Sequence, residues 1–219
     1  MPGLVLAING SPRRNANTAE LLQCALQGAK DAGATTDIVH LYTLNFKGCI
    51  SCFACKRKDK EHGICALRDD LSPLLERIKT ADAVLFGSPI YFMNLASGLI
   101  ACLERLFFSQ YLYSTTIPTV FPKSLPSAFI YTMNMTEAQA KFFHMPERLD
   151  FYEKATAQHF RIPPKTLWAY NTYQFKDYSK YESSIFSEPD KKAWRETMWP
   201  TYRDQAYALG QTLVTTPER

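Results

Sequence analysis

The segment that decides the fold is GLVLAINGSPRRNANTAELLQCALQGAKDAG, residues 3–33. It begins with a nearly uninterrupted apolar run at 3–9, typical of a strand buried on both faces of a parallel sheet. Residues 18–32 then place leucine and alanine at helical spacing, and Gly33 follows as a stop signal. Because residues 37–41 have the pattern of a second strand, the segment predicts a parallel strand–helix–strand unit whose first strand is central.

The same alternation continues along the chain. Apolar runs predict further strands at 81–88, 127–133 and 166–170, and helical patterns predict helices from Asp69-Asp70 onward, at 95–108 and at 190–213. This order predicts an α/β doubly wound sheet with helices on both faces. We expect one domain over residues 1–219, with a cysteine-bearing loop at about 45–68 and ordered insertions at about 109–126 and 170–189.

Composition excludes several classes of protein. Apolar residues make up 46% of the 219 residues and charged residues 21%, which is ordinary globular usage. The net charge of +4 is dispersed apart from Lys56-Arg57-Lys58, so no nucleic-acid partner is expected. The opening apolar run is too short for a membrane span and has no basic flank, so we expect a cytoplasmic protein without membrane association.

The loop after the first predicted strand, residues 9–18, leads directly into a helix whose free N–H groups favour an anion. It lacks the Walker lysine and the three-glycine dinucleotide fingerprint, so a triphosphate or the pyrophosphate of NAD or FAD fits poorly. One dianionic phosphate, such as that of FMN, suits it better. The groups available to surround that phosphate are the hydroxyls of Ser11 and Thr18, the amides of Asn15 and Asn17, and the guanidinium of Arg13 or Arg14. Asn17 with Glu20 also fits a helix N-cap, and both interpretations can hold together.

A second motif, Gly87-Ser88-Pro89-Ile90-Tyr91-Phe92-Met93-Asn94, stands at the carboxyl end of a predicted strand beside the first, where open α/β sheets bind ligands. It resembles the S-P-x-Y loop of NADPH-dependent FMN reductases and related flavodoxin-like proteins. The loop at 9–18 resembles their phosphate loop, and the likeness extends over about residues 3–135. The resemblance implies a flavodoxin-like, five-stranded parallel sheet in the order 2-1-3-4-5.

The resemblance also implies a cofactor site and an activity. Ser11, Arg13, Asn17 and Thr18 would hold the FMN phosphate, Pro89, Ile90, Tyr91, Phe92 and Asn94 would line the flavin ring, and Thr132, Met133 and Asn134 would form a third flavin loop. A competing interpretation makes Tyr91 and Phe92 core aromatics. The expected reaction is NAD(P)H-dependent reduction of a quinone, nitro compound or flavin, by a homodimer or homotetramer. The alternative is an electron carrier that serves a redox protein partner.

The cysteine segment is the last motif. Cys49, Cys52, Cys55 and Cys65 resemble the compact motif of iron-sulfur flavoproteins, which implies four thiolates around a 4Fe–4S cluster. Nine residues separate Cys55 from Cys65, a longer gap than in that family. A zinc site, a reversible thiol switch and cysteines that simply pack therefore stay open as alternatives. The neighbouring basic run at 56–58 either lowers the thiol pKa values or forms a solvated loop, and Cys24 and Cys102 are expected in the core.

Overall fold

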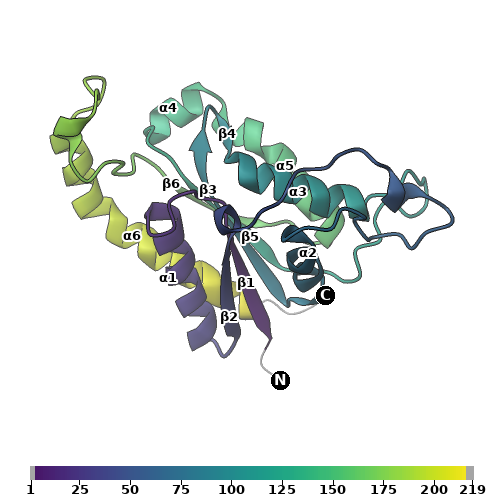
Figure 1. The fold of residues 1–219 in the computed structure, drawn as a ribbon. Helices are drawn as coiled ribbons and strands as arrows, with labels where there is room; N and C mark the ends of the chain where they lie inside the picture. The colour runs from purple at the N-terminus through teal and green to yellow at the C-terminus, as the bar shows by residue number, and fades with distance from the viewer. Residues whose placement is uncertain (1–2, 216–219) are drawn as a thin grey trace.

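The computed structural model describes residues 3–215, in which parallel strands form a sheet of order β2-β1-β3-β5-β6 (Figure 1). The strands are β1 (Leu4–Asn9), β2 (Thr35–His40), β3 (Ala83–Tyr91), β5 (Ser127–Thr132) and β6 (Lys165–Ala169). The short β4 (Asn94–Leu95) pairs antiparallel with the end of β3. When only the parallel strands are counted, this is the predicted order 2-1-3-4-5. The ends of the predicted domain, residues 1–2 and 216–219, lie outside the described residues.

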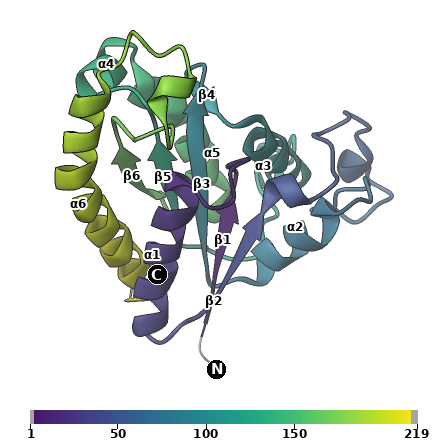
Figure 2. The same cartoon turned by 60° about the vertical axis from the view of Figure 1, so that its left-hand side comes forward.

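Helices cover both faces of the sheet (Figure 2). One layer holds α1 (Asn17–Asp31) and α6 (Glu188–Thr215), and the other holds α2 (Leu71–Thr80), α3 (Ser97–Gln110) and α5 (Met145–Phe160). Strand β1 shows why its sequence is apolar throughout: Leu6 and Ile8 pack under α2 and α3, whereas Val5 and Ala7 pack under α1 and α6. The doubly wound prediction is confirmed.

The first and last helices pack with their backbones unusually close. A Cβ atom on Gly210 would lie 1.7 Å from the carbonyl oxygen of Ala25, so only glycine fits at this crossing. Helix α6 was predicted at 190–213 and extends two residues further at each end; it continues without a break across Pro200. No helix within residues 3–215 is long and apolar enough to cross a membrane.

Several sequence-based boundaries were wrong, and two helices were missed. The chain between β5 and β6 contains α4 (Glu137–Phe142) and α5, which the sequence analysis did not predict. Strand β3 extends to Tyr91 instead of ending at Ser88, and α3 begins at Ser97 instead of 95 because β4 takes the preceding residues.

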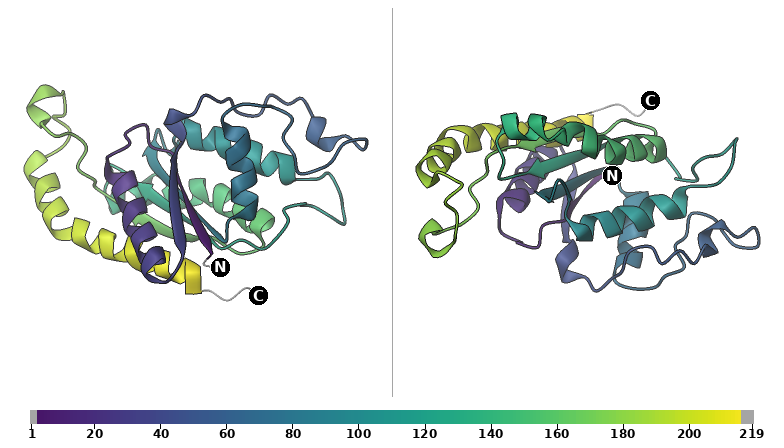
Figure 3. Two further views of the ribbon diagram at one scale, coloured as in Figure 1. Left: turned by 60° about the horizontal axis from the view of Figure 1, so that its bottom comes forward. Right: turned by 90° about the horizontal axis from the view of Figure 1, so that it is seen from above.

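The predicted insertions lie at two ends of the molecule. Residues 45–68 and 111–126 extend on the side of α2 and α3, whereas residues 170–189 cross over to reach α6 (Figure 3). The second insertion begins at 111 instead of 109 because α3 continues to Gln110. Short 3-10 helices lie within these segments at η2 (Ala54–Lys56) and η3 (Tyr178–Lys180), and η1 (Leu41–Thr43) directly follows β2.

Candidate functional site

The loop after β1, the carboxyl end of β3, and the end of β5 with the loop that follows it meet in one pocket at the carboxyl edge of the sheet. Because parallel strands end at the same edge, loops far apart in sequence become neighbours there. A fourth wall comes from the segment after β6, which sequence reasoning left unexplained. The lining residues are Ser11, Arg13, Ala16, Asn17, Thr18, Pro89, Ile90, Tyr91, Thr132, Met133, Asn134, Thr172 and Gln174.

The loop after β1 is shaped by its own side chains. Asn9 is fully buried, and its Oδ1 accepts from the backbone N–H of Ser11 at 2.9 Å. The Ser11 hydroxyl in turn accepts from the N–H of Arg13 at 3.2 Å. Gly10 is required because a Cβ atom there would lie 2.8 Å from Cβ of Leu99. The loop is therefore held in shape before any ligand binds.

A buried hydroxyl pair joins this loop to β5. Oγ1 of Thr18 and Oγ1 of Thr132 lie 2.8 Å apart, and the two residues are 2% and 4% exposed. Either hydroxyl can donate. When Thr132 donates, the hydrogen of Thr18 is free to donate to a ligand in the pocket.

The 170–189 segment and α6 hold the loop at 9–18 from outside. Arg13 Nη1 donates to the carbonyl of Gln174 at 2.7 Å, and Asn17 Nδ2 donates to the carbonyl of Tyr173 at 3.0 Å. Asn17 Oδ1 accepts from Arg195 Nη1 at 3.0 Å. These bonds join residues more than 150 positions apart, which no local sequence pattern reveals.

The N-cap interpretation of Asn17 was wrong. Ala16 occupies the N-cap position of α1, where no side-chain capping bond forms. The side chain of Asn17 is already used by long-range partners. Glu20, expected to complete a capping box, accepts instead from Trp199 Nε1 at 2.8 Å.

The loop after β5 presents an unused acceptor. Asn134 Oδ1 is buried and has no hydrogen-bond partner within residues 3–215. The backbone of Asn134 is fixed, because its carbonyl accepts from Lys191 Nζ at 2.9 Å, and Lys191 also donates to Asn171 Oδ1 at 2.7 Å. Burial lowers the pKa of Lys191 to about 8. An N–H donor on a bound ligand would satisfy the amide oxygen.

The structure leaves Asn15, Phe92 and Asn94 out of the pocket lining. Asn15 is exposed, and Asn94 Oδ1 accepts from Tyr152 on α5 at 3.1 Å. Phe92 and Met93 form the turn of the β3–β4 hairpin with φ of 45° and 62°, and the Phe92 side chain is fully exposed. A turn with both central residues at positive φ normally uses asparagine and glycine, so Phe92-Met93 carries no sequence signal for such a turn. The alternative in which Tyr91 and Phe92 are core aromatics is also wrong, since Tyr91 is 41% exposed.

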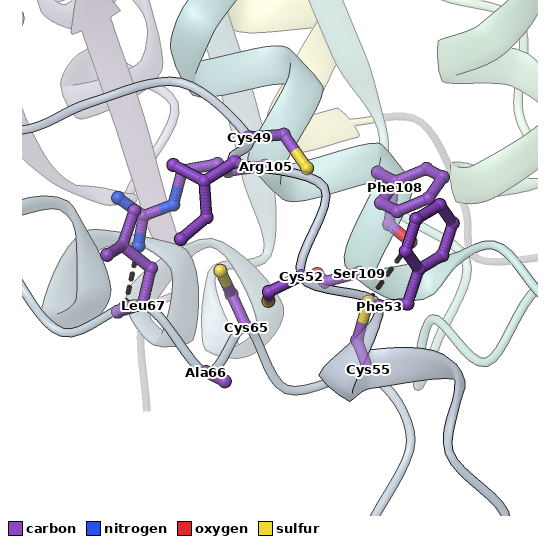
Figure 4. A pocket seen from close by; sticks show the side chains of 11 residues that line it. Cys49, Cys52, Phe53, Cys55, Cys65, Ala66, Leu67, Arg105, Phe108 and Ser109 are labelled. Carbon is purple, nitrogen blue, oxygen red and sulfur yellow. Dashed lines mark hydrogen bonds between the residues drawn. The ribbon is translucent and has the colours of Figure 1, made fainter.

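The four cysteines of the predicted motif line one small cavity between residues 48–67 and α3 (Figure 4). Their sulfur atoms surround the space from different directions and do not meet at one point (Figure 4). All six cysteines of the chain are free thiols. Within residues 3–215, no group of three or more His, Cys, Asp or Glu side chains is placed to hold a single metal ion.

One wall of this cavity is Arg105 of α3, which is 1% exposed. Its Nη1 donates to the carbonyl of Lys47 at 3.3 Å and to Asp69 Oδ2 at 2.5 Å, and its Nη2 donates to the carbonyl of Leu67 at 2.8 Å. Burial opposes ionisation of Asp69, but the bonds from Arg105 and from the N–H of Lys47 bring its pKa below the ordinary value. Arg105 thus closes the cysteine segment at both of its ends.

The basic run beside the cysteines divides in the structure. Lys56 folds back so that Nζ donates to the carbonyls of Phe108 and Tyr111 and lies 4.2 Å from the centre of the Phe108 ring. Burial raises the pKa of Cys55 although Lys56 opposes the change, so the expected lowering of its pKa is wrong. Arg57 pairs with Asp59 on the surface.

Cys102 lies in the core as predicted, where burial raises its pKa to about 12, whereas Cys24 is only half-buried.

Comparison with known proteins shows the family that the chain resembles. The family model described as NADPH-dependent FMN reductase matches residues 4–119, just over half of the chain. An iron-sulfur flavoprotein of Methanocaldococcus jannaschii is 35% identical over 101 residues, which are 46% of this chain and 50% of that protein. An iron-sulfur flavoprotein of Archaeoglobus fulgidus is 38% identical over 101 residues, 46% of this chain and 47% of that one. The chain spans about half the length of the curated relatives it matches.

Solved structures share the fold over nearly the whole chain. The NAD(P)H:quinone oxidoreductase from Methanothermobacter marburgensis superposes with a TM-score of 0.68 at 17% identity, covering 97% of this chain and 98% of that one. The azoreductase from Bacillus anthracis gives 0.69 at 14% identity, covering 96% and 99%. At these identities the likeness concerns the fold, which is the flavodoxin-like class expected from the sequence.

Proposed function

The chain belongs to the NADPH-dependent FMN reductase family, and on that premise we propose that it is an FMN-dependent oxidoreductase that takes electrons from NAD(P)H. The observation that carries the proposal is the pocket in which the loop after β1 meets the carboxyl ends of β3 and β5. The compound that the enzyme reduces would be a quinone, a nitro compound or free flavin.

Different residues of the pocket would bind the phosphate and the ring of FMN. The hydroxyls of Ser11 and Thr18 and the guanidinium of Arg13 would bind the phosphate at the start of α1, where the helix dipole favours an anion. Asn134 would accept a hydrogen bond from the ring through its unused Oδ1. Pro89, Ile90 and Tyr91, together with Thr132 and Met133, would form the walls around the ring. When bound, FMN supplies the transfer of electrons from a nicotinamide to an acceptor.

The test is flavin binding followed by reduction. We expect apoprotein to bind FMN, and NADPH to bleach the flavin absorption band under argon. The double variant Ser11→Ala/Arg13→Ala should bind FMN more weakly, since each change removes a proposed phosphate contact. The matched control is Arg57→Ala, which removes an exposed arginine far along the chain. Equal affinity in the double variant would contradict the placement of the phosphate.

A specific observation also favours a 4Fe–4S cluster in the cysteine cavity, and we propose this as the second function. Four thiols line one cavity together with a buried guanidinium, and the Nε of that guanidinium has no partner within residues 3–215. A cation with a free donor in the wall of a cavity suits an anionic group bound there. A cluster of four irons holds its thiolates further apart than one zinc ion does, which suits sulfurs that surround a space. Cys49, Cys52, Cys55 and Cys65 would be its ligands and would connect it to electron transfer.

Iron and acid-labile sulfide in anaerobically purified protein test this second proposal. We expect both in the wild-type chain and their loss in Cys65→Ala. Cys24→Ala is the matched control, because Cys24 lies outside the cavity and should leave the iron content unchanged. Wild-type protein without iron would contradict the cluster.

The competing role is an electron carrier between protein partners. Absence of bleaching by NADPH, with ready reduction by ferredoxin, would favour that role over the reductase. The single domain, the cytoplasmic location and the homodimer or homotetramer expected from the sequence stay proposals.

A further inference from the structure

The two sides of the Arg105 guanidinium differ in their contacts. The far end of its guanidinium is fully used, since Nη1 and Nη2 bond to Lys47, Leu67 and Asp69. These residues flank the cysteines on both sides, so the contacts are sufficient to explain a purely structural role in which Arg105 holds the two ends of the segment together. We call this role the clip. The near edge, Nε, is buried and has no partner among the described residues. A clip alone does not explain this unused donor.

The unused donor belongs to the wall of the cysteine cavity. Arg105 lines the cavity together with Cys49, Cys52, Cys55 and Cys65, and Figure 4 shows its side chain on the side of Cys49 and Cys65. Burial opposes the charge of Arg105, but Asp69 and Cys65, both within hydrogen-bonding reach of the guanidinium, raise its pKa above the ordinary value. A buried donor of this kind costs free energy unless a ligand or an anion accepts from it.

Arg105 pairs with one carboxylate among the described residues. Asp69 compensates its charge at the far end, at 2.5 Å from Nη1. A cluster held by four thiolates is negative overall and becomes more negative on reduction. A fixed cation beside it stabilises the reduced form more than the oxidised form, because the attraction grows with the negative charge.

We propose that Arg105 is the internal counter-ion of the cysteine cavity, whose Nε–H donates to the sulfur of Cys65 and whose charge raises the reduction potential of the group held there. The inference rests on the proposed cluster. Potentials of iron–sulfur groups respond to net charge and to hydrogen bonds to sulfur, so the role has a direct readout. Arg105 is a positioning residue in this account and does not itself exchange electrons.

A redox titration of the anaerobically purified holoprotein, followed by electron paramagnetic resonance, separates this role from the clip. We expect a more negative midpoint potential in Arg105→Met, and a smaller shift in the same direction in Arg105→Lys, which keeps the charge and loses Nε–H. Asp69→Asn removes the opposite charge of the same pair and should shift the midpoint to more positive values. Arg57→Gln, an exposed arginine paired with Asp59, should leave it unchanged.

The Asp69 variant keeps the proposal testable if Arg105→Met does not fold. A clip alone predicts that Asp69→Asn and Arg105→Lys loosen the segment in the same way, so shifts of the same sign would overturn the counter-ion role. Iron-loaded Arg105→Lys and Asp69→Asn with the wild-type midpoint would also overturn it. Iron-free wild-type protein would instead overturn the cluster itself, and the role of Arg105 with it.

Discussion

Replacement of Thr18 by valine tests how the phosphate loop is joined to the sheet. Valine has nearly the shape of threonine, so the change removes the hydroxyl and leaves the packing. The hydroxyl of Thr132, 4% exposed and 2.8 Å from that of Thr18, then has no partner from this pair. An unsatisfied buried hydroxyl costs about 1–3 kcal/mol of the free energy of unfolding. Thr132→Val should cost a similar amount, and the double variant less than the sum of the two, because the same bond is lost.

The same variants also rank FMN affinity. Of the two paired hydroxyls, that of Thr18 and not that of Thr132 is proposed to donate to the phosphate, and a bond to a charged group is worth about 1.5–3 kcal/mol, or roughly 10- to 100-fold in affinity. Thr132→Val should have a smaller effect, because it only removes the donor to Thr18. Urea unfolding of apoprotein and titration of flavin fluorescence measure the two quantities, with exposed Thr166→Val as the control. Wild-type stability together with wild-type affinity in Thr18→Val would refute the reasoning.

Three further predictions concern the fold, the pH dependence and the ring pocket. Gly210→Ala should lower the free energy of unfolding by about 3 kcal/mol or more, because its Cβ would lie 1.7 Å from the carbonyl oxygen of Ala25; urea unfolding at the wild-type midpoint would contradict this packing. Burial, and next the charge of Lys56, lower the pKa of His159 to about 4 from 6.5. The free energy of unfolding is therefore highest above pH 6.5 and falls by up to about 3 kcal/mol as the pH drops toward 4, because the unfolded chain binds the proton first. His159→Gln should flatten the pH dependence of unfolding, and an unchanged slope would argue against it. Asn134→Ala should weaken FMN binding and leave apoprotein stability within about 0.5 kcal/mol, since Oδ1 has no partner among the described residues; a large loss of stability would show that the amide is structural.

The parallel strands were predictable because burial on two faces leaves a strong signal in sequence. The run at 4–9 has no polar alternation, since Leu6 and Val5 enter different cores. Helix α5 left no such signal. Its buried positions are few, and His144 precedes it in a left-handed conformation without a side-chain cap. The sequence around it therefore resembles a polar loop.

The pocket was predictable as far as it depends on strand ends. Ser11, Pro89 and Thr132 lie at or just beyond the carboxyl ends of different strands of one parallel sheet and meet for that reason. Thr172 and Gln174 were missed because their position depends on long-range bonds such as that from Arg13 to Gln174. These bonds involve backbone carbonyls, which every residue has, so side-chain chemistry could not point to them.

The cysteine cavity was predictable from spacing, but Arg105 was not. Arg105 lies about 40 residues beyond Cys65 and next to Glu104 on a mainly apolar helix, where it has the pattern of an ordinary solvated side chain. Only the packing of α3 against residues 47–69 shows that it is buried.

The absorption spectrum of anaerobically purified protein, followed by titration of its apoprotein with FMN, is the most direct test of whether the pocket holds FMN. We expect a flavin spectrum, release of FMN on denaturation, and saturation of the apoprotein at one FMN per chain. Thr18→Val should need more FMN to reach the same saturation. Colourless protein whose apoprotein takes up no FMN would contradict the assignment of the pocket at the carboxyl edge of the sheet.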